Sequence, residues 1–374
     1  MLSRRQAVKR IGAVGGALLA RPLAAAAAQG AQQPPGPPST VTNPPRDFGP
    51  NAPPTTYFTD PDIVAVDPSF SALVQANSSI KRLWTGALWA EGPAWSGQGR
   101  YLVWSDIPNN RQLRWVEDDE RITVFRSPSN NSNGNTFDFQ GRQLSCEHLT
   151  RRVVRYEHDG SVTVIADSFE GKTLNSPNDI APHPDGSYWF TDPPYGRQLY
   201  EGAPAKRDLP NAVYRVDSSG KIVRVITEEQ VPDPNGIAFS PDYKKLYIAS
   251  TGKGPGDTHA GGKGNMFVCD VTSNNSVSTP RVFSEFMIDG VRCSTDGVRC
   301  DVTGHVWCSS NAGRAVGYSG VTVWTPQGKL IGRIRLPEVC ANLCFGGPKR
   351  NRLFMAASQS VYAVYVNTQG ASPG

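Results

Sequence analysis

Hydrophobic and polar positions follow the same order in six segments of the chain. Each segment has a polar residue, a short apolar stretch, a turn rich in Gly, Asp or Pro, and an aromatic or β-branched stretch. Apolar positions that alternate on both sides of such turns are typical of β-hairpins, so each segment is predicted to form one. The segments begin at Glu91, Asn135, Asn178, Asn235, Asp296 and Asn342, with successive starts 44, 43, 57, 61 and 46 residues apart.

Further strand-like stretches extend each hairpin. A third stretch follows every segment, as in QLRWVE (112–117) and VYAVYV (361–366), and a fourth follows all but the last. Residues 79–86, SIKRLWTG, precede the first segment and can supply the strand that the last unit lacks, which would remove two free sheet edges. The pattern therefore predicts an all-β fold: a six-bladed β-propeller with four antiparallel strands per blade and a ring closed by N- and C-terminal strands.

Two other architectures explain the pattern less well. Helical periodicity is nearly absent, which argues against a doubly wound sheet or a β/α barrel. A pair of β-sandwiches would leave six copies of one polar position unexplained.

The shared polar position is the first candidate for chemistry. In a propeller the first strand of each blade lines the central channel, so these six residues are expected to converge near one mouth. Glu91 and Asp296 are carboxylates and the other four are amides. Converging carboxylates repel unless a cation or proton lies between them, and an oxygen set without clustered His or Cys suits a hard divalent cation. The alternative is that each polar residue only caps the turn before its strand.

The second strand of each blade returns to the same mouth. Its final residues include Glu147 and His148, which are candidate substrate contacts. The corresponding residues of other blades are Asp106, Asp192, Ser250 and Ser309. Ordinary loop polarity is the alternative explanation for all of them. Asp179 takes the place that glycine fills after other site residues, which favours a local backbone role for it.

The N-terminal residues predict export. Residues 1–28 contain Ser3-Arg4-Arg5, a mildly apolar stretch at 11–20 and an Ala-rich end suited to cleavage, as in a twin-arginine signal. A plain amphipathic helix or a Sec signal is the alternative. Residues 29–60 are Pro-rich and polar, which predicts an extended linker, and residues 61–374 form the predicted propeller domain.

Export changes the meaning of the charge. All of the formal net charge of +5 can be assigned to residues 1–28, which carry five Lys or Arg and no acid. The exported protein would be nearly neutral, so no nucleic-acid partner is expected. No apolar run in the body is long enough to span a bilayer, so no membrane anchor is expected after signal cleavage. The predicted location is periplasmic or secreted, with the twin-arginine export machinery as a partner.

Several other kinds of site are poorly supported. The seven cysteines include no CxxC pair, which argues against a zinc ribbon or a redox motif. The sequence has no GxSxG elbow and no HExxH motif, and its five histidines form no tight group.

In their order along the chain, the motifs resemble one known family. The carriers are EGPAW (91–95), SCEHLTRRVVRYEHDG (145–160), LNSPNDIAPHPDGSYWFTDPPYG (174–196), PNGIAFSPD (234–242) and DGVRCDVTGHVW (296–307). Together they resemble the gluconolactonase-like propellers, which include regucalcin and sugar lactonases, over about residues 80–366. The middle motifs are most similar to the bacterial gluconolactonase branch.

The resemblance implies a site with one divalent metal ion. Its ligands would be Glu91, Asn235 and Asp296, with Asn178 as a fourth ligand or a substrate contact. Calcium is the first choice, and Mg, Mn, Zn or Fe(II) also accept this oxygen set. Asp296 would also be the catalytic base. Ser176 stands where relatives place a substrate-binding Arg, so that contact is missing here.

The implied reaction is hydrolysis of a sugar lactone such as glucono-1,5-lactone to its aldonic acid. The metal would polarise the carbonyl, and Asp296 would take a proton from the attacking water. The predicted substrate contacts are Asn135, Ser176, Asn178, Glu147 and His148. A phosphotriesterase or other esterase using the same metal, or a propeller that only binds a partner, are the alternatives.

Overall fold

The computed structural model describes residues 60–252, 264–272, 276–313 and 315–371. The predicted export signal (1–28) and nearly all of the predicted linker (29–60) lie outside these residues. Within the described residues, no helix has the length and apolar character needed to cross a bilayer. The fold is a six-bladed β-propeller, as predicted, with four antiparallel strands in the basic blade.

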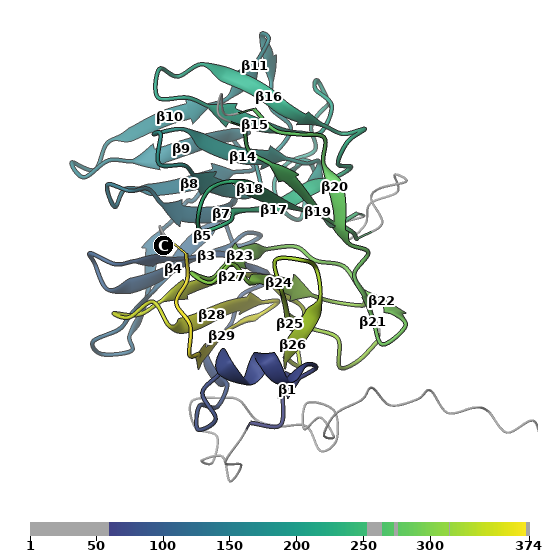
Figure 1. The fold of residues 1–374 in the computed structure, drawn as a ribbon. Coiled ribbons are helices and arrows are strands. Elements are labelled where there is room, and N and C mark those ends of the chain that lie inside the picture. Colours follow the sequence, from purple (N-terminus) through teal and green to yellow (C-terminus); the bar gives the residue numbers. More distant parts are fainter. Residues whose placement is uncertain (1–59, 253–263, 273–275, 314, 372–374) are drawn as a thin grey trace, which may run out of the picture. The chain divides into compact units, whose positions relative to one another are not determined.

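Each blade runs from an inner strand at the channel to an outer strand at the edge (Figure 1). Blades 1, 2 and 3 contain, in this order, β3 (Ala90–Ser96), β4 (Tyr101–Asp106), β5 (Arg111–Val116) and β6 (Ile122–Arg126); β7 (Ser132–Phe137), β8 (Gln143–Glu147), β9 (Arg152–Tyr156) and β10 (Val162–Ala166); β13 (Ile180–Pro182), β14 (Tyr188–Asp192), β15 (Ala212–Val216) and β16 (Ile222–Thr227).

Blades 4, 5 and 6 follow the same order. They contain β17 (Pro234–Phe239), β18 (Lys245–Ser250), β19 (Met266–Asp270) and β20 (Arg281–Ser284); β23 (Val298–Cys300), β24 (Val306–Ser310), β25 (Gly320–Trp324) and β26 (Leu330–Arg335); β27 (Cys340–Gly346), β28 (Arg352–Ala357), β29 (Ser360–Tyr365) and β2 (Lys81–Thr85).

The ring closes through both ends of the domain. The inner strands β3, β7, β13, β17, β23 and β27 each contact the next, and β27 contacts β3 again. Strand β2 is the outer strand of blade 6, where Lys81 pairs with Ala363 of β29. The predicted use of residues 79–86 as the missing strand is therefore confirmed.

Blade 5 has an additional strand that the repeat pattern does not contain. Strand β1 (Ile63–Ala65) pairs with β26, opposite Ile334 to Gly332, and the short 3₁₀ helix η1 (Pro68–Ala72) follows it. Phe70 of η1 is fully buried and packs near Trp307, with ring centroids 6.3 Å apart. The segment covers an edge that would otherwise expose unpaired backbone groups. Two short hairpins, β11–β12 (Ser168–Phe169, Lys172–Thr173) and β21–β22 (Met287–Ile288, Val291–Arg292), also lie outside the blades.

The core lies between the faces of neighbouring blades. Trp95 of blade 1 stacks on Phe354 of blade 6 with ring centroids 5.7 Å apart, and Trp104, Trp189 and Trp307 are fully buried. All seven cysteines lie within the described residues, where they are buried and unpaired. Apolar contact between sheets supplies most of the stabilisation, because the inner and middle strands bury both faces.

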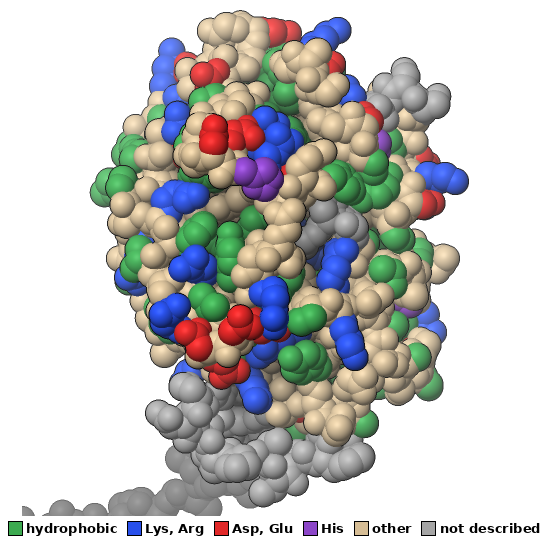
Figure 2. Space-filling view, turned by 90° about the vertical axis from the view of Figure 1, so that its left-hand side faces the viewer, with side chains coloured by type: hydrophobic (Ala, Val, Ile, Leu, Met, Phe, Trp, Pro, Cys, Tyr) green, Lys and Arg blue, Asp and Glu red, His purple; other side chains and the backbone are tan. Residues whose placement is uncertain are grey.

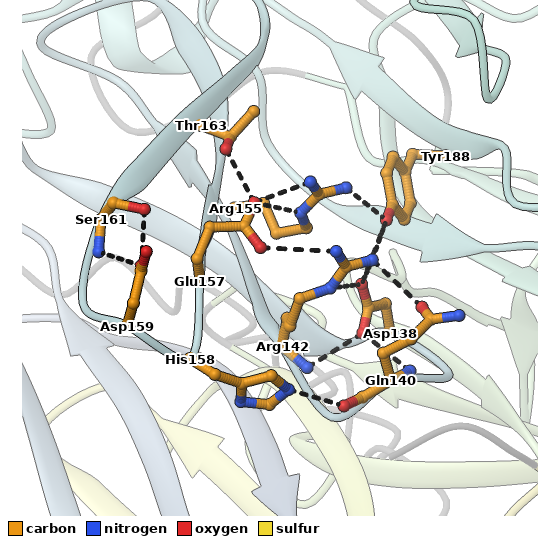
Figure 3. A network of polar contacts seen from close by, with 10 residues as sticks. All are labelled: Asp138, Gln140, Arg142, Arg155, Glu157, His158, Asp159, Ser161, Thr163 and Tyr188. Carbon is orange, nitrogen blue, oxygen red and sulfur yellow. Dashed lines mark hydrogen bonds and ion pairs between the residues drawn. The ribbon is translucent and has the colours of Figure 1, made fainter.

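Charged groups join blades 2 and 3 just after the last residue of β7. Figure 3 shows Asp138, which follows β7, bound by Arg142 at 2.8 Å and by the Tyr188 hydroxyl of blade 3 at 3.1 Å. Arg155 joins Glu157 to the same Tyr188 hydroxyl. On the face in Figure 2, Lys and Arg side chains are interspersed with Asp and Glu.

At the channel, glycine amides join one inner strand to the next. Gly134 N–H donates to the Asn178 carbonyl at 2.8 Å, Gly236 N–H to the Asp296 carbonyl at 3.0 Å, and Gly297 N–H to the Ala341 carbonyl at 2.8 Å. A Cβ on Gly236 would lie 2.0 Å from the Asp296 carbonyl oxygen. Only glycine permits this approach, so packing between neighbouring inner strands requires glycine at positions 134, 236 and 297.

The Gly236→Ala substitution tests this constraint. The added methyl group must push blades 4 and 5 apart, and we expect a loss of about 1–3 kcal/mol of unfolding free energy. Gly97→Ala is the matched control, because a Cβ there would meet nothing within 4 Å. Chemical denaturation of both variants measures the difference; equal stabilities would contradict the packing argument.

Candidate metal and substrate site

A cavity of about 430 Å³ opens where the inner strands begin. Its polar lining includes the carboxyl groups of Glu91, Glu201 and Asp296 and the amides of Asn133, Asn178, Asn235 and Asn311, together with Thr251 and Ser294. Trp89, Tyr195 and Val339 contribute part of its apolar wall. The cavity therefore combines an oxygen-rich floor with flat apolar surfaces, as small-molecule sites commonly do.

The fold places the four predicted ligands at equivalent points of four blades. Glu91 and Asn235 are the second residues of β3 and β17, and Asn178 and Asp296 lie two residues before β13 and β23. All four line the cavity, so the fold brings these residues together, and their roles as metal ligands stay predictions.

Unsatisfied oxygens indicate what this floor can bind. Within the described residues, the Oδ1 atoms of Asn178, Asn235 and Asp296 are buried without a hydrogen-bond partner. A buried polar atom without a partner costs about 1–3 kcal/mol, so several at one place require a ligand or ordered water. A hard divalent cation would satisfy all three, because oxygens are its preferred donors.

The two carboxyl groups of the floor are strongly perturbed. Burial raises the pKa of Glu91 to about 8, and the charges of Asp179 and Glu201 contribute, although the Gly92 amide opposes the shift by donating to Glu91. Burial and then the Glu91 charge raise the pKa of Asp296 well above its usual range. In the absence of a cation, these groups therefore favour their protonated forms at neutral pH.

The four predicted ligands include only two side chains that can carry a negative charge. Among the described residues, no cluster of three or more His, Cys, Asp or Glu side chains has the arrangement of a metal site. A cation here would depend on two carboxylates and on amide oxygens, which suits calcium or magnesium better than a soft metal.

These pKa shifts predict that a cation displaces protons. At pH 7, calcium added to metal-free protein should release protons from Glu91 and Asp296. The calcium affinity should fall as the pH drops below about 8, by up to about tenfold per pH unit for each proton released. Calorimetry in buffers of different ionisation enthalpy measures the release. The Asp296→Asn variant should bind more weakly and release fewer protons; unchanged release would contradict this assignment.

Asn135 lies in blade 2 but does not line the cavity among the described residues. Its side chain is buried and bonds the Gly92 carbonyl at 2.9 Å and the Gln112 amide at 3.0 Å. The second residue of β7 is Asn133, which does line the cavity and has an unsatisfied Oδ1. The placement of Asn135 at the shared position is therefore wrong by two residues, although its substrate role stays a prediction.

The signal for Asn133 is present in the sequence. Asn133-Gly134 repeats the polar-glycine pair of Glu91-Gly92 and Asn235-Gly236. In blade 6 the corresponding residue is Ala341, whose carbonyl accepts the Gly297 N–H, and not the expected Asn342. The Asn342 Oδ1 accepts the N–H of Leu343, and the Asn342 side chain also bonds the carboxyl group of Glu91.

The expected contacts at the ends of the second strands mostly support the loops that carry the site. Asp106 accepts the Leu88 N–H at 2.9 Å, Asp192 the Ser176 N–H at 2.8 Å, and the Ser309 hydroxyl the Asp296 N–H at 2.9 Å. Glu147 is buried and binds Arg152 at 2.6 Å. Asp106, Asp192 and Ser309 thus satisfy backbone donors of the loops, whereas Glu147 binds side chains.

Ser176 is also engaged within the protein. Its hydroxyl donates to the Pro193 carbonyl at 2.6 Å and accepts the Gly196 N–H at 3.1 Å. In the described part of the chain, neither Ser176 nor Glu147 lines the cavity, and their substrate roles stay predictions.

His148 links the floor to the segment after β14. Its Nδ1 lies 3.0 Å from the Glu201 carbonyl oxygen, which can only accept, so Nδ1 carries the proton. Its Nε2 therefore accepts from the Asn133 Nδ2 at 3.3 Å, which leaves the Asn133 Oδ1 for a ligand. Burial lowers the pKa of His148 to about 4, so the ring is neutral at pH 7. His148 positions Asn133 and Glu201, and direct contact with a substrate stays a prediction.

His148 should make stability depend on pH in a defined direction. Because its folded pKa of about 4 lies below the ordinary 6.5, its contribution is full above pH 6.5 and is lost as the pH falls from 6.5 to 4. The loss should approach about 3 kcal/mol. The difference in unfolding free energy between the wild type and His148→Gln, measured from pH 7 to pH 4, isolates this group. A constant difference would contradict the neutral, buried ring.

Asp179 has a wider role than the expected local one. It accepts the Ile180 N–H at 2.9 Å, but it also forms an ion pair with Arg299 of β23, with Asp179 Oδ2 3.0 Å from Arg299 Nη1. Both side chains are largely buried, and the pair links blade 5 to the residue before β13 of blade 3. The expectation missed this because the two residues are 120 positions apart.

Glu201 lines the cavity without any sequence signal. It lies in the segment 193–211 between β14 and β15, outside every repeated motif, and its side chain is 13% exposed. Burial raises its pKa to about 7. The repeat pattern misses this residue because the segment belongs to none of the repeated motifs.

The geometry defines a six-bladed propeller with an oxygen-rich cavity at the mouth of its channel. Residues 89–359 match the family model described as "SMP-30/Gluconolactonase/LRE-like region". The chain belongs to this family, which confirms the resemblance seen in the motifs.

Individual relatives agree with this assignment. The gluconolactonase of Zymomonas mobilis subsp. mobilis is 27% identical over 328 residues, covering 82% of this chain and 87% of that protein. The structure of a gluconolactonase from Xanthomonas campestris is similar at a TM-score of 0.68 and 30% identity, covering 81% of this chain and 94% of that chain. Regucalcin from Agrobacterium tumefaciens, at 19% identity, covers 77% and 94% with a TM-score of 0.60 and is similar in fold.

Proposed function

We propose that this protein is a lactone hydrolase that opens a sugar lactone, such as glucono-1,5-lactone, to its aldonic acid. The observation that carries the proposal is the floor of the cavity, where three unsatisfied amide and carboxyl oxygens meet the buried carboxyl of Glu91. Relatives named gluconolactonase and lactonohydrolase support the reaction class.

The residues fit one divalent cation held by Glu91, Asn178, Asn235 and Asp296. When bound, the cation supplies a Lewis acid that polarises the lactone carbonyl. Calcium is the proposed ion, since every donor is an oxygen and the floor is assembled from four separate blades.

The side chains of the cavity would bind and orient the substrate. The Asn133 Oδ1 is free to accept a bond from a sugar hydroxyl, because the Asn133 amide is held by His148. Trp89 and Tyr195 offer aromatic surfaces to the apolar face of a ring. Asp296 would accept the proton of the attacking water as the new C–O bond forms.

A substrate panel tests this function. Calcium-loaded protein should hydrolyse glucono-1,5-lactone above the spontaneous rate, and chelation should abolish the difference. Glu91→Gln and Asp296→Asn should each lower kcat/KM by about 100-fold or more. Glu229→Gln, which changes an exposed carboxylate of blade 3, is the matched control.

The remaining outcomes distinguish the alternatives. Faster turnover of a phosphotriester than of any lactone would replace the lactonase with an esterase on the same site. Binding of sugars or proteins without turnover, unchanged in both carboxyl variants, would indicate a binding propeller and overturn the proposal.

We also propose that residues 1–28 direct export to the periplasm through the twin-arginine route. The support is the Arg4-Arg5 pair ahead of the apolar and Ala-rich stretches. In a Gram-negative host, replacing both arginines with lysine should leave the uncleaved chain in the cytoplasm, as shown by fractionation and N-terminal mass. Arg10→Lys should be exported normally. Normal export of the double variant would point to the Sec route.

A further inference from the structure

The segment 193–211 reaches from blade 3 to two other blades. The Tyr200 hydroxyl donates to the carbonyl of Leu88, which lies just before blade 1, at 3.2 Å. The next residue, Glu201, accepts the His148 Nδ1–H of blade 2 through its carbonyl at 3.0 Å. These two bonds hold consecutive residues beside the mouth and place the Glu201 side chain in the cavity wall.

Close packing fixes this segment on His148. A Cβ on Gly196 would lie 2.2 Å from the His148 Cγ, and a Cβ on Gly202 would lie 2.0 Å from the Gly196 carbonyl oxygen. Glycine is therefore required at both places, and the backbone on either side of Glu201 has little freedom to shift. The Glu201 Oε2 lies 3.8 Å from the His148 Nδ1, which already donates to the backbone carbonyl of Glu201.

The three carboxyl groups of the cavity divide into two kinds. Glu91 and Asp296 lie beside the unsatisfied amides and are the carboxyl groups proposed above as cation ligands. Glu201 comes from the wall and is not part of that set. Opening a lactone needs one further group, because the departing ring oxygen of an alkyl lactone is a poor leaving group until it receives a proton.

We propose that Glu201 is the catalytic proton donor to the ring oxygen of the lactone. The inference rests on the proposed function, and it assigns the protonation of the departing ring oxygen, a step that has no other proposed donor in the cavity. Water adds its oxygen to the carbonyl carbon and gives a proton to Asp296, the acyl carbon–ring oxygen bond breaks, and the ring oxygen takes the Glu201 proton. The product is the hydroxy acid, and solvent returns the proton from Asp296 to Glu201.

The surroundings of Glu201 suit this role. Burial raises its pKa to about 7, near the value that makes a donor effective at neutral pH. The charged or titratable groups that face it are Glu91 and Asp296 across the cavity, and His148, Tyr195 and Tyr200, which are neutral at pH 7.

Dependence on the leaving group tests the proposal. We expect Glu201→Gln to lower kcat for glucono-1,5-lactone by about 100-fold with little change in KM. The same variant should lose less than about tenfold on dihydrocoumarin, whose phenolic oxygen departs without prior protonation. The wild type should lose kcat for the sugar lactone at alkaline pH as Glu201 loses its proton, and the residual activity of the variant should lack this basic limb.

Controls separate the role of a proton donor from a structural one. Glu229→Gln should match the wild type on both substrates, and thermal unfolding and calcium affinity report whether Glu201→Gln keeps its fold and floor. Equal losses on the two lactones, or a retained basic limb, would overturn the proton donor while leaving the lactonase intact. A wild type that turns over neither lactone would overturn the proposed function itself.

Discussion

The close approach of neighbouring inner strands at glycine is the constraint on which the rest of the structure depends. Where the Gly236 N–H reaches the Asp296 carbonyl at 3.0 Å, a side chain on the glycine would collide with the next blade. The same contact recurs at Gly134 and Gly297. Since the residue before each glycine must then point along the channel, the backbone contacts that hold the ring together also direct the site residues into one cavity.

The electrostatics of the cavity follow from this placement. Two carboxyl groups and several amide oxygens are brought out of water together, and burial disfavours their charge more than any nearby donor supports it. These carboxyl groups are stable in the cavity when they are protonated or when they bind a cation. A cation that binds replaces the protons, and metal binding therefore depends on pH. The buried guanidinium of Arg299 forms its ion pair with Asp179 and not with either carboxyl group of the floor.

Some polar residues around the mouth hold the loops in place, and others line the cavity. Asp106, Asp192 and Ser309 bind loop amides, and His148 holds both Asn133 and the segment that carries Glu201. A polar residue beside the mouth can therefore hold a loop or a neighbouring side chain in place without lining the cavity. The carboxyl of Glu201 differs from these because its backbone makes the anchoring bond and its side chain lines the cavity.

The sequence by itself determined the fold, the closure of the ring by residues 79–86 and four cavity residues, because the hydrophobic alternation recurs in each blade and the polar-glycine pair recurs in four of them. The polar-glycine pair marked Asn133 in the sequence, but the bulge in β7 that separates Asn133 from Asn135 depends on pairing with β8 and was decided by the structure. The Asp179–Arg299 pair and Glu201 were decided only by the tertiary structure. They depend on contacts between blades and on one unrepeated segment, and no local pattern records which distant residues a closed ring brings together.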